Sequence, residues 1–267
     1  MSEFILKARD LNKFYTQRTG RLGFGTTLVK ALDNVSLELR HATTLAVVGE
    51  SGSGKSTLAR CLLQLQPLDG GSVFFQGRDL ADLPAQELRK QRRYLQMIFQ
   101  DPFASLNPRM RVAEIVSEGL LIHGLGDADE RFEKTRQMLE RVGLKESDMK
   151  KYPHEFSGGQ RQRIGIARAL VLSPKVVVCD EPVSALDVSI QAQILLLLKE
   201  LQQEMSLSYI FISHDLRVVR HIADEVAVMR KGKIVEVGNI NDIYQSPQEE
   251  YTRSLLSAIP GQKRLVA

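Results

Sequence analysis

The fold of this 267-residue chain is decided by the stretch Leu45-Ala46-Val47-Val48-Gly49-Glu50-Ser51-Gly52-Ser53-Gly54-Lys55-Ser56. Four apolar residues lead into a glycine-rich loop of the pattern G-x-x-x-x-G-K-[ST], and residues 55–66 follow with the apolar spacing of a helix. A continuous apolar run predicts a strand that is buried on both faces. The order strand, loop, helix therefore predicts the opening of an α/β unit.

This loop has the composition that binding a chain of phosphates requires. Glycines let successive N–H groups point at one place, and the helix N-terminus adds the positive end of its dipole. We expect Lys55 to reach the β- and γ-phosphates and Ser56 to ligate Mg²⁺. The predicted phosphate-binding residues are Gly49, Glu50, Ser51, Gly52, Ser53, Gly54, Lys55, Ser56 and Thr57.

A second apolar run, at residues 175–179, ends in the two acids Asp180 and Glu181. Ligands of open α/β sheets bind beyond the carboxyl ends of the strands. We expect Asp180 to hold Mg²⁺, directly or through water, and Glu181 to polarise the water that attacks the γ-phosphate. Taken alone, the run could also be a strand that ends in solvent, but the phosphate loop upstream favours the catalytic interpretation.

The rest of the chain shows no internal repeat and no low-complexity linker. Apolar patterns predict further strands at residues 6–9, 35–39, 72–76, 209–212 and 225–229. Lys231-Gly232 predicts a tight hairpin, and Asp187 to Glu204 predicts a helix. Residues 84–144 are predicted to be mainly helical, with loops at Asp101-Pro102 and Asn107-Pro108.

Composition and charge give little support to a nucleic-acid-binding protein, a protein with a cysteine-ligated metal site or a membrane-spanning protein. The net charge of +4 is weak evidence for nucleic-acid binding, and the basic cluster at residues 89–93 predicts a solvated helix face, with a phosphate or membrane-surface contact as the alternative. Cys61 and Cys179 cannot form a four-thiolate metal site and are expected to be buried and reduced, which fits the cytoplasm. No signal peptide is expected, and no apolar run approaches the ~18–20 residues of a membrane helix.

A third motif, Phe156-Ser157-Gly158-Gly159-Gln160, precedes a helical run. Here the sequence resembles the ATP-binding-cassette family, whose signature is Leu-Ser-Gly-Gly-Gln. This chain departs from that signature only by Phe at position 156. A hydroxyl and two glycines at a helix N-terminus form a second anion site. Because one chain needs only one such site for its own ATP, the motif implies that ATP lies between two chains.

The resemblance implies roles for other positions. Gln100 is similar to the glutamine that contacts Mg²⁺ and couples to the membrane partner, Asp187 ends the D-loop, and His214 is similar to the histidine that senses the γ-phosphate. Tyr15 is similar to the aromatic residue that stacks on adenine, with Phe14 as the alternative. The implied catalytic residues are Lys55, Glu181 and His214. The implied metal ligands are Ser56, Gln100 and Asp180. The implied further ATP contacts are Tyr15, Gln100, Ser157, Gly158, Gly159, Gln160 and Asp187.

Three stretches resemble the peptide and nickel importer branch of that family, namely residues 100–109, 181–193 and 246–260. That branch usually has His-Pro before the Tyr-Thr of its tail, where this chain has Glu249-Glu250. The resemblance implies an ATP-hydrolysing subunit that drives uptake of di- or oligopeptides, or of a related solute such as nickel chelates or glutathione.

The implied partners are two membrane-spanning permease subunits, a second ATPase subunit (the same or a sister chain) arranged head to tail, and indirectly an extracytoplasmic solute-binding protein. No nucleic acid is expected, and the implied location is the cytoplasmic face of the inner membrane. The alternative is a soluble cassette protein that acts on DNA or ribosomes, but the long coiled-coil insertions and zinc cysteines usual in such proteins are absent from this chain. A non-hydrolysing cassette is disfavoured because Lys55, Asp180, Glu181 and His214 are all present.

The expected fold is an α/β P-loop NTPase with a RecA-like core, an antiparallel β layer and an inserted helical subdomain. We expect one ATPase domain across residues 1–267. Residues 1–87 and 171–240 would form the core with its β layer, residues 88–170 the helical subdomain, and residues 241–267 a C-terminal tail.

Overall fold

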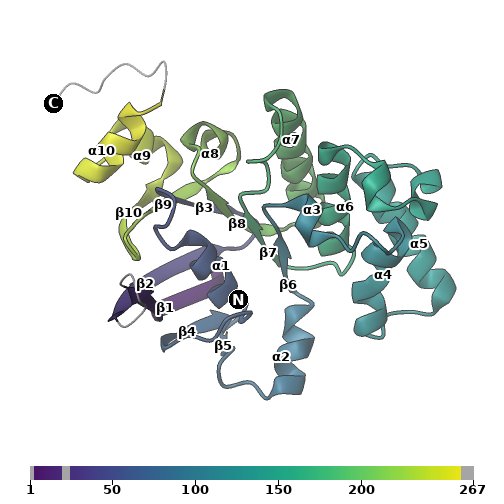
Figure 1. Cartoon of the computed structure of the whole chain (residues 1–267), viewed down its shortest axis with the longest axis horizontal. Helices are drawn as coiled ribbons and strands as arrows, with labels where there is room; N and C mark the ends of the chain where they lie inside the picture. The colour runs from purple at the N-terminus through teal and green to yellow at the C-terminus, as the bar shows by residue number, and fades with distance from the viewer. Residues whose placement is uncertain (1–2, 20–24, 260–267) are drawn as a thin grey trace. The chain divides into compact units, whose positions relative to one another are not determined.

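The computed structural model describes residues 3–19 and 25–259 (Figure 1). The chain comprises two compact units. The first combines Met1–Leu83 with Ile210–Ala267, and the second is Pro84–Tyr209.

The first unit contains a four-stranded antiparallel sheet in the order β2-β1-β4-β5. Its strands are β1 (Phe4–Thr19), β2 (Gly25–Arg40), β4 (Gly70–Phe75) and β5 (Arg78–Asp79). The predicted antiparallel β layer is therefore present. The sequence predicted only short pieces of β1 and β2, because register shifts on both sides of Leu11 interrupt the two-residue alternation.

The first unit also contains strands in the order β10-β9-β3-β8, namely β10 (Lys233–Asn239), β9 (Glu225–Arg230), β3 (Thr44–Val48) and the last four residues of β8 (Ser208–Ser213). β3 runs parallel to β9, whereas β10 runs antiparallel to it. All five residues of β3 are buried, as the apolar run predicts. The antiparallel β9–β10 pair confirms the hairpin predicted at Lys231-Gly232.

The helices of the first unit are α1 (Lys55–Leu62), α8 (Leu216–Ile222), α9 (Ile240–Gln245) and α10 (Glu250–Ser257). The prediction that the first helix extends to residue 66 is wrong by four residues. Gln64 adopts a φ of +52°, and the Leu65 N–H bonds back to the Arg60 carbonyl at 2.9 Å. This left-handed closure ends α1 although apolar residues continue beyond it.

The second unit contains the parallel strands β6 (Leu95–Ile98) and β7 (Val176–Asp180). Its α-helices are α2 (Ala85–Arg92), α3 (Pro102–Ser105), α4 (Val112–Ile122), α5 (Ala128–Arg141), α6 (Gly158–Leu170) and α7 (Val188–Met205), and its 3-10 helices are η1 (Glu146–Lys150) and η2 (Pro153–Glu155). The sequence did not predict β6, because four residues between a charged helix and a loop show too short a pattern. Pairing with β7, about 80 residues away, defines this strand.

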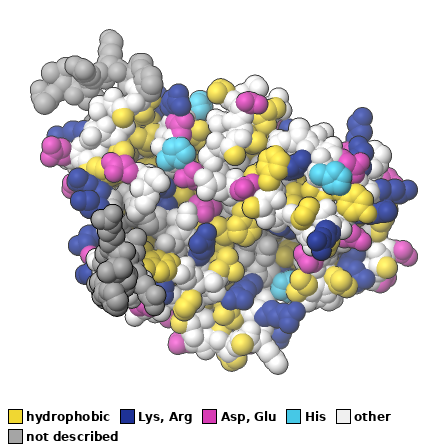
Figure 2. Space-filling view, viewed as in Figure 1, with side chains coloured by type: hydrophobic (Ala, Val, Ile, Leu, Met, Phe, Trp, Pro, Cys, Tyr) yellow, Lys and Arg dark blue, Asp and Glu magenta, His cyan; other side chains and the backbone are white. Residues whose placement is uncertain are grey.

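The burial of the side chains bears on two further expectations, for the two cysteines and for the basic cluster. Cys61 and Cys179 are both buried, as expected, and burial raises the pKa of the Cys61 thiol to about 11. α2 buries none of its residues, which confirms the solvated face predicted for the basic cluster. On the face shown in Figure 2, Lys and Arg side chains are interspersed with Asp and Glu.

Within residues 3–19 and 25–259, no helix combines the length and apolarity that spanning a membrane requires.

Candidate nucleotide site

The glycine-rich loop joins β3 to α1 in the first unit, as predicted. Gly54 occupies the N-cap position of α1 with a φ of +109°, and a Cβ there would collide with the Ala31 carbonyl oxygen of β2. Gly52 has a φ of +80° in open space. Left-handed backbone favours glycine at both positions, and the close approach of β2 also requires it at Gly54. The loop can therefore curl over the first turn of α1.

The side chain of Lys55 lies inside this loop and is only 5% exposed as a residue. Its Nζ donates to the carbonyl oxygens of Gly49 and Glu50, both at 2.8 Å, and lies 3.5 Å from Ser53 Oγ. A buried ammonium needs such acceptors to replace water. The loop thus holds a fixed positive charge beside the first N–H groups of α1, which is the arrangement that attracts phosphate.

The predicted adenine-stacking residue lies in the C-terminal half of β1. Tyr15 is 36% exposed, whereas Phe14 is half-buried, so Tyr15 is the more exposed residue of the two. Asp69 secures this part of β1, because its carboxylate accepts from the Phe14 N–H at 2.6 Å and pairs with Lys13 Nζ at 3.0 Å. Both contacts lower the pKa of Asp69, and the hydrogen bond from the Phe14 N–H has the larger effect. The sequence gave no sign of this role for Asp69, since nothing local connects it to a strand 55 residues earlier.

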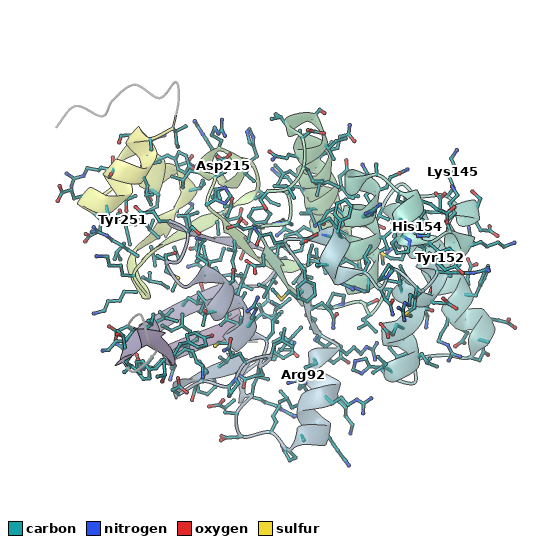
Figure 3. The ribbon with its side chains drawn as sticks, viewed as in Figure 1. Arg92, Lys145, Tyr152, His154, Asp215 and Tyr251 are labelled. Carbon is teal, nitrogen blue, oxygen red and sulfur yellow. The ribbon has the colours of Figure 1, made fainter. Side chains whose placement is uncertain are left out.

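His214 follows β8 and is exposed. The neighbouring Asp215, which is labelled in Figure 3, accepts from the Arg217 N–H at 2.9 Å at the start of α8 and pairs with the Arg217 guanidinium at 2.7 Å. The hydrogen bonds from the Arg217 side chain hold the pKa of Asp215 below its ordinary value. The Asp215 N–H also donates to Ser213 Oγ at 3.0 Å. The residues on both sides of His214 are therefore held in place.

In the second unit, Asp180 is the buried last residue of β7, and Glu181 follows in the left-handed region with a φ of +46°. Such a conformation is uncommon for a residue with a Cβ and is found at functional turns. Gln100 Nε2 donates to Glu181 Oε2 at 3.1 Å and lies 3.5 Å from Ser184 Oγ. The structure thus joins two predicted site residues that are 81 positions apart in the sequence.

The segment after Glu181 is stabilised by a glutamine that the sequence did not suggest as a site residue. Gln191 Nε2 donates to the carbonyl oxygens of Val183 at 3.0 Å and Leu186 at 2.9 Å. Asp187 is exposed at the N-cap of α7, one turn before Gln191. Gln191 therefore fixes the backbone that presents Asp187.

The signature motif starts α6 with a reciprocal capping box. The Gln160 N–H donates to Ser157 Oγ at 3.4 Å, and the Ser157 N–H donates to Gln160 Oε1 at 3.0 Å. A Cβ on Gly159 would lie 2.6 Å from Ile190 Cγ2, whereas one on Gly158 would make an ordinary contact with Leu186 at 3.5 Å. The motif thus combines an exposed helix N-terminus with close packing against α7.

Comparison with known proteins decides the family. Residues 32–184, more than half of the chain, match the family described as ABC transporter. This chain belongs to the ABC transporter family. The resemblance drawn from the signature motif is confirmed, and so is the expected class of enzyme, an ATPase that serves transport.

Two curated relatives of this ABC ATPase cover nearly all of it. One is named a putative peptide import ATP-binding protein, from Brucella ovis, and is 53% identical over 256 residues, covering 96% of this chain and 78% of its own length. The other is the dipeptide transport ATP-binding protein DppF of Escherichia coli. It is 53% identical over 258 residues, covering 96% of this chain and 76% of its own length.

A solved structure confirms the expected P-loop NTPase fold of the ABC ATPase. It is the dimeric post-hydrolysis state of the ATP-binding cassette MJ0796 bound to ADP and Pi. The two structures agree with a TM-score of 0.77 at 29% sequence identity, over 88% of this chain and 98% of the other.

Proposed function

We propose that this chain is the ATP-hydrolysing subunit of an importer for di- or oligopeptides. The observation that carries the proposal is the 53% identity, over 96% of the chain, to proteins named for peptide import. The transport names of these relatives give no support to a soluble cassette that acts on DNA or ribosomes. Nickel chelates and glutathione are the competing solutes that the experiment below must separate from peptides.

The nucleotide proposed for this chain is ATP with Mg²⁺. The Ser56 hydroxyl, the Gln100 amide oxygen and the Asp180 carboxylate are hard oxygen donors, the type that Mg²⁺ prefers. Because Gln100 Nε2 donates to Glu181, its amide oxygen remains for a cation. When bound, Mg²⁺ supplies neutralisation of the charge that develops on the phosphate oxygens.

Each side chain has a separate role in this proposal. Lys55 and the loop N–H groups hold the phosphates, and Tyr15 stacks on adenine. Glu181 polarises the attacking water and takes its proton, while Gln100 orients the Glu181 carboxylate through the 3.1 Å hydrogen bond. His214 contacts the γ-phosphate. Phosphoryl transfer depends on such positioning more than on covalent chemistry.

We assign the signature motif to the ATP of a second ATPase subunit. Ser157, Gly158 and Gly159 begin α6 in the second unit, whereas the phosphate loop begins α1 in the first. A head-to-tail pair of chains, the same or sister chains, uses both motifs twice and closes on itself. The dimeric state of MJ0796 supports the pairing of two such cassettes. ATP would then shift the population toward the closed pair, because it provides contacts that exist only there.

The surface proposed to contact the permease is the segment from Gln100 to residue 118. Phe103 in this segment is 59% exposed, and Phe99 just before it is 41% exposed, so both offer apolar surface to a partner. The Arg161 guanidinium lies 4.0 Å from the Phe103 ring centroid, and Arg168 donates to the Ser105 carbonyl. Both arginines belong to α6, so a force on this surface would reach the signature helix.

The wider assembly follows the resemblance. Two permease subunits and an extracytoplasmic solute-binding protein would complete the importer, with this chain at the cytoplasmic face of the inner membrane. Residues 88–170 would act as the helical subdomain, residues 1–87 and 171–240 as the core, and residues 241–267 as the tail.

The experiment is reconstitution of the complete transporter in vesicles, with a dipeptide, a longer peptide, a nickel chelate and glutathione each supplied to the solute-binding protein. Peptide uptake and peptide-stimulated ATP hydrolysis are expected, and the Lys55→Ala complex should show neither. Stimulation by nickel or glutathione alone would refute the peptide proposal while leaving the ATPase assignment intact.

A further inference from the structure

The C-terminal part of the described chain forms hydrogen bonds with the rest of the first unit at several points. The Glu236 carboxylate of β10 accepts from the backbone N–H groups of Gln248 at 2.7 Å and Glu249 at 3.2 Å, just before α10. The Tyr244 hydroxyl of α9 donates to the Leu216 carbonyl of α8. The first pair of contacts fixes the start of α10 against β10, and the second contact fixes α9 against α8.

On α10, Tyr251 reaches the phosphate loop itself. Tyr251, which is labelled in Figure 3, is only 8% exposed, and its hydroxyl accepts from the Glu50 N–H at 3.3 Å. Burial has the largest effect and raises the pKa of the phenol above its ordinary value, although the hydrogen bond from the Glu50 backbone N–H lowers it, so the hydroxyl stays protonated at physiological pH. The Arg230 guanidinium lies 4.6 Å from the ring centroid, at the end of β9.

Glu50 is the residue through which this contact acts on the site. Its N–H donates to Tyr251, and its carbonyl oxygen accepts from Lys55 Nζ at 2.8 Å. A displacement of the Glu50 backbone therefore moves an acceptor of the buried lysine. At a second point of the loop, the Gly232 N–H donates to the Ser53 carbonyl at 2.9 Å. The hairpin and α10 thus hold the loop at two separate points.

From these contacts we infer that Tyr251 is a positioning residue for nucleotide binding, which acts by holding Glu50 so that the phosphate loop keeps Lys55 in its binding position. The inference rests on the proposed phosphate-binding role of the loop. In this role the C-terminal segment stabilises the phosphate loop through a contact from outside the strand–loop–helix motif. Tyr251 touches no reacting atom in this role.

The test compares two conservative variants of adjacent residues. Tyr251→Phe removes the hydroxyl and keeps the ring. Thr252→Val is the matched control on the same helix, because Thr252 is 1% exposed and its Oγ1 has no hydrogen-bond partner among the described residues. The dissociation constant of a fluorescent ATP analogue, KM for ATP, kcat and the nucleotide-free melting temperature are measured for each full-length variant.

Tyr251→Phe is expected to raise KM and the dissociation constant about threefold to tenfold, as loss of one hydrogen bond predicts, with kcat within about twofold. Its nucleotide-free melting temperature should match that of Thr252→Val. Unchanged nucleotide affinity in Tyr251→Phe, or an equal loss of affinity in Thr252→Val, would overturn the inference. A Lys55→Ala chain that binds the analogue normally would instead refute the phosphate-loop assignment, so the two failures are distinguishable.

Discussion

We predict that replacement of Glu181 by Gln separates catalysis from binding in this ABC ATPase. The amide has nearly the shape of the carboxylate, and its oxygen can still accept from Gln100 Nε2, which is 3.1 Å away in the wild type. The new side chain cannot take a proton from water. Loss of a positioned general base typically costs a factor of about 10²–10⁴ in rate. This corresponds to about 3–5 kcal/mol of activation free energy.

The cost in stability should be much smaller. A hydrogen bond to a charged acceptor stabilises by about 1.5–3 kcal/mol and one to a neutral acceptor by about 0.5–1.5 kcal/mol, so the change lowers stability by about 1 kcal/mol. The half-buried position of Glu181 reduces that figure further. Both residues carry a Cβ, so the strain of the +46° φ is unchanged. The melting temperature should therefore fall by no more than about 2–4 °C.

The assay pairs single-turnover hydrolysis with equilibrium binding of ATP. Glu200→Gln is the control, because it removes the same charge from an exposed position on α7. Glu181→Gln should bind ATP with near wild-type affinity, accumulate ATP-dependent dimers and hydrolyse at least about 100-fold more slowly. Hydrolysis at the rate of the Glu200→Gln control would refute the role of Glu181, and loss of ATP binding would refute the separation of the two functions.

Four further outcomes are expected. Lys55→Ala should weaken ATP binding about tenfold to 100-fold, because an ammonium–phosphate contact is lost, and unchanged affinity in a binding titration would count against the loop. Gly158→Asp should leave ATP binding by monomers intact but abolish dimerisation, and mixing it with Lys55→Ala chains should restore some hydrolysis; loss of monomer binding contradicts a shared site. Single cysteines from Phe103 to Arg111 should crosslink to the permease in membranes, whereas crosslinks found only elsewhere would move the interface. Arg217 lowers the pKa of Asp215 from 3.8, so the stabilisation of the fold by this ion pair is complete above about pH 4 and is lost as the pH falls through the lowered pKa. In urea unfolding, Arg217→Ala should therefore lower the free energy of unfolding more at pH 6 than at pH 2.5. An equal loss at both pH values would contradict the pairing.

Local sequence was sufficient wherever the chemistry is continuous along the chain. The phosphate loop needs glycines, Lys55 and Ser56 within eight residues, and the signature needs a capping residue and glycines at one helix start. Such motifs define their own backbone, so the strand before the loop and the helix after it could be predicted directly. The acids at the end of β7 follow the same rule, because the apolar run and the polar residues that end it are adjacent.

Tertiary structure decided whatever depends on residues that are distant in sequence. β6 is a strand because β7 pairs with it, and the bulges of β1 hide its full length from any periodic pattern. Side-chain contacts follow the same principle. Asp69 reaches Phe14 across 55 positions, Gln100 reaches Glu181 across 81, and Tyr251 reaches Glu50 across 201. Hydrogen bonds of this kind form only when folding brings the partners within about 3 Å, and no spacing along the chain encodes that proximity.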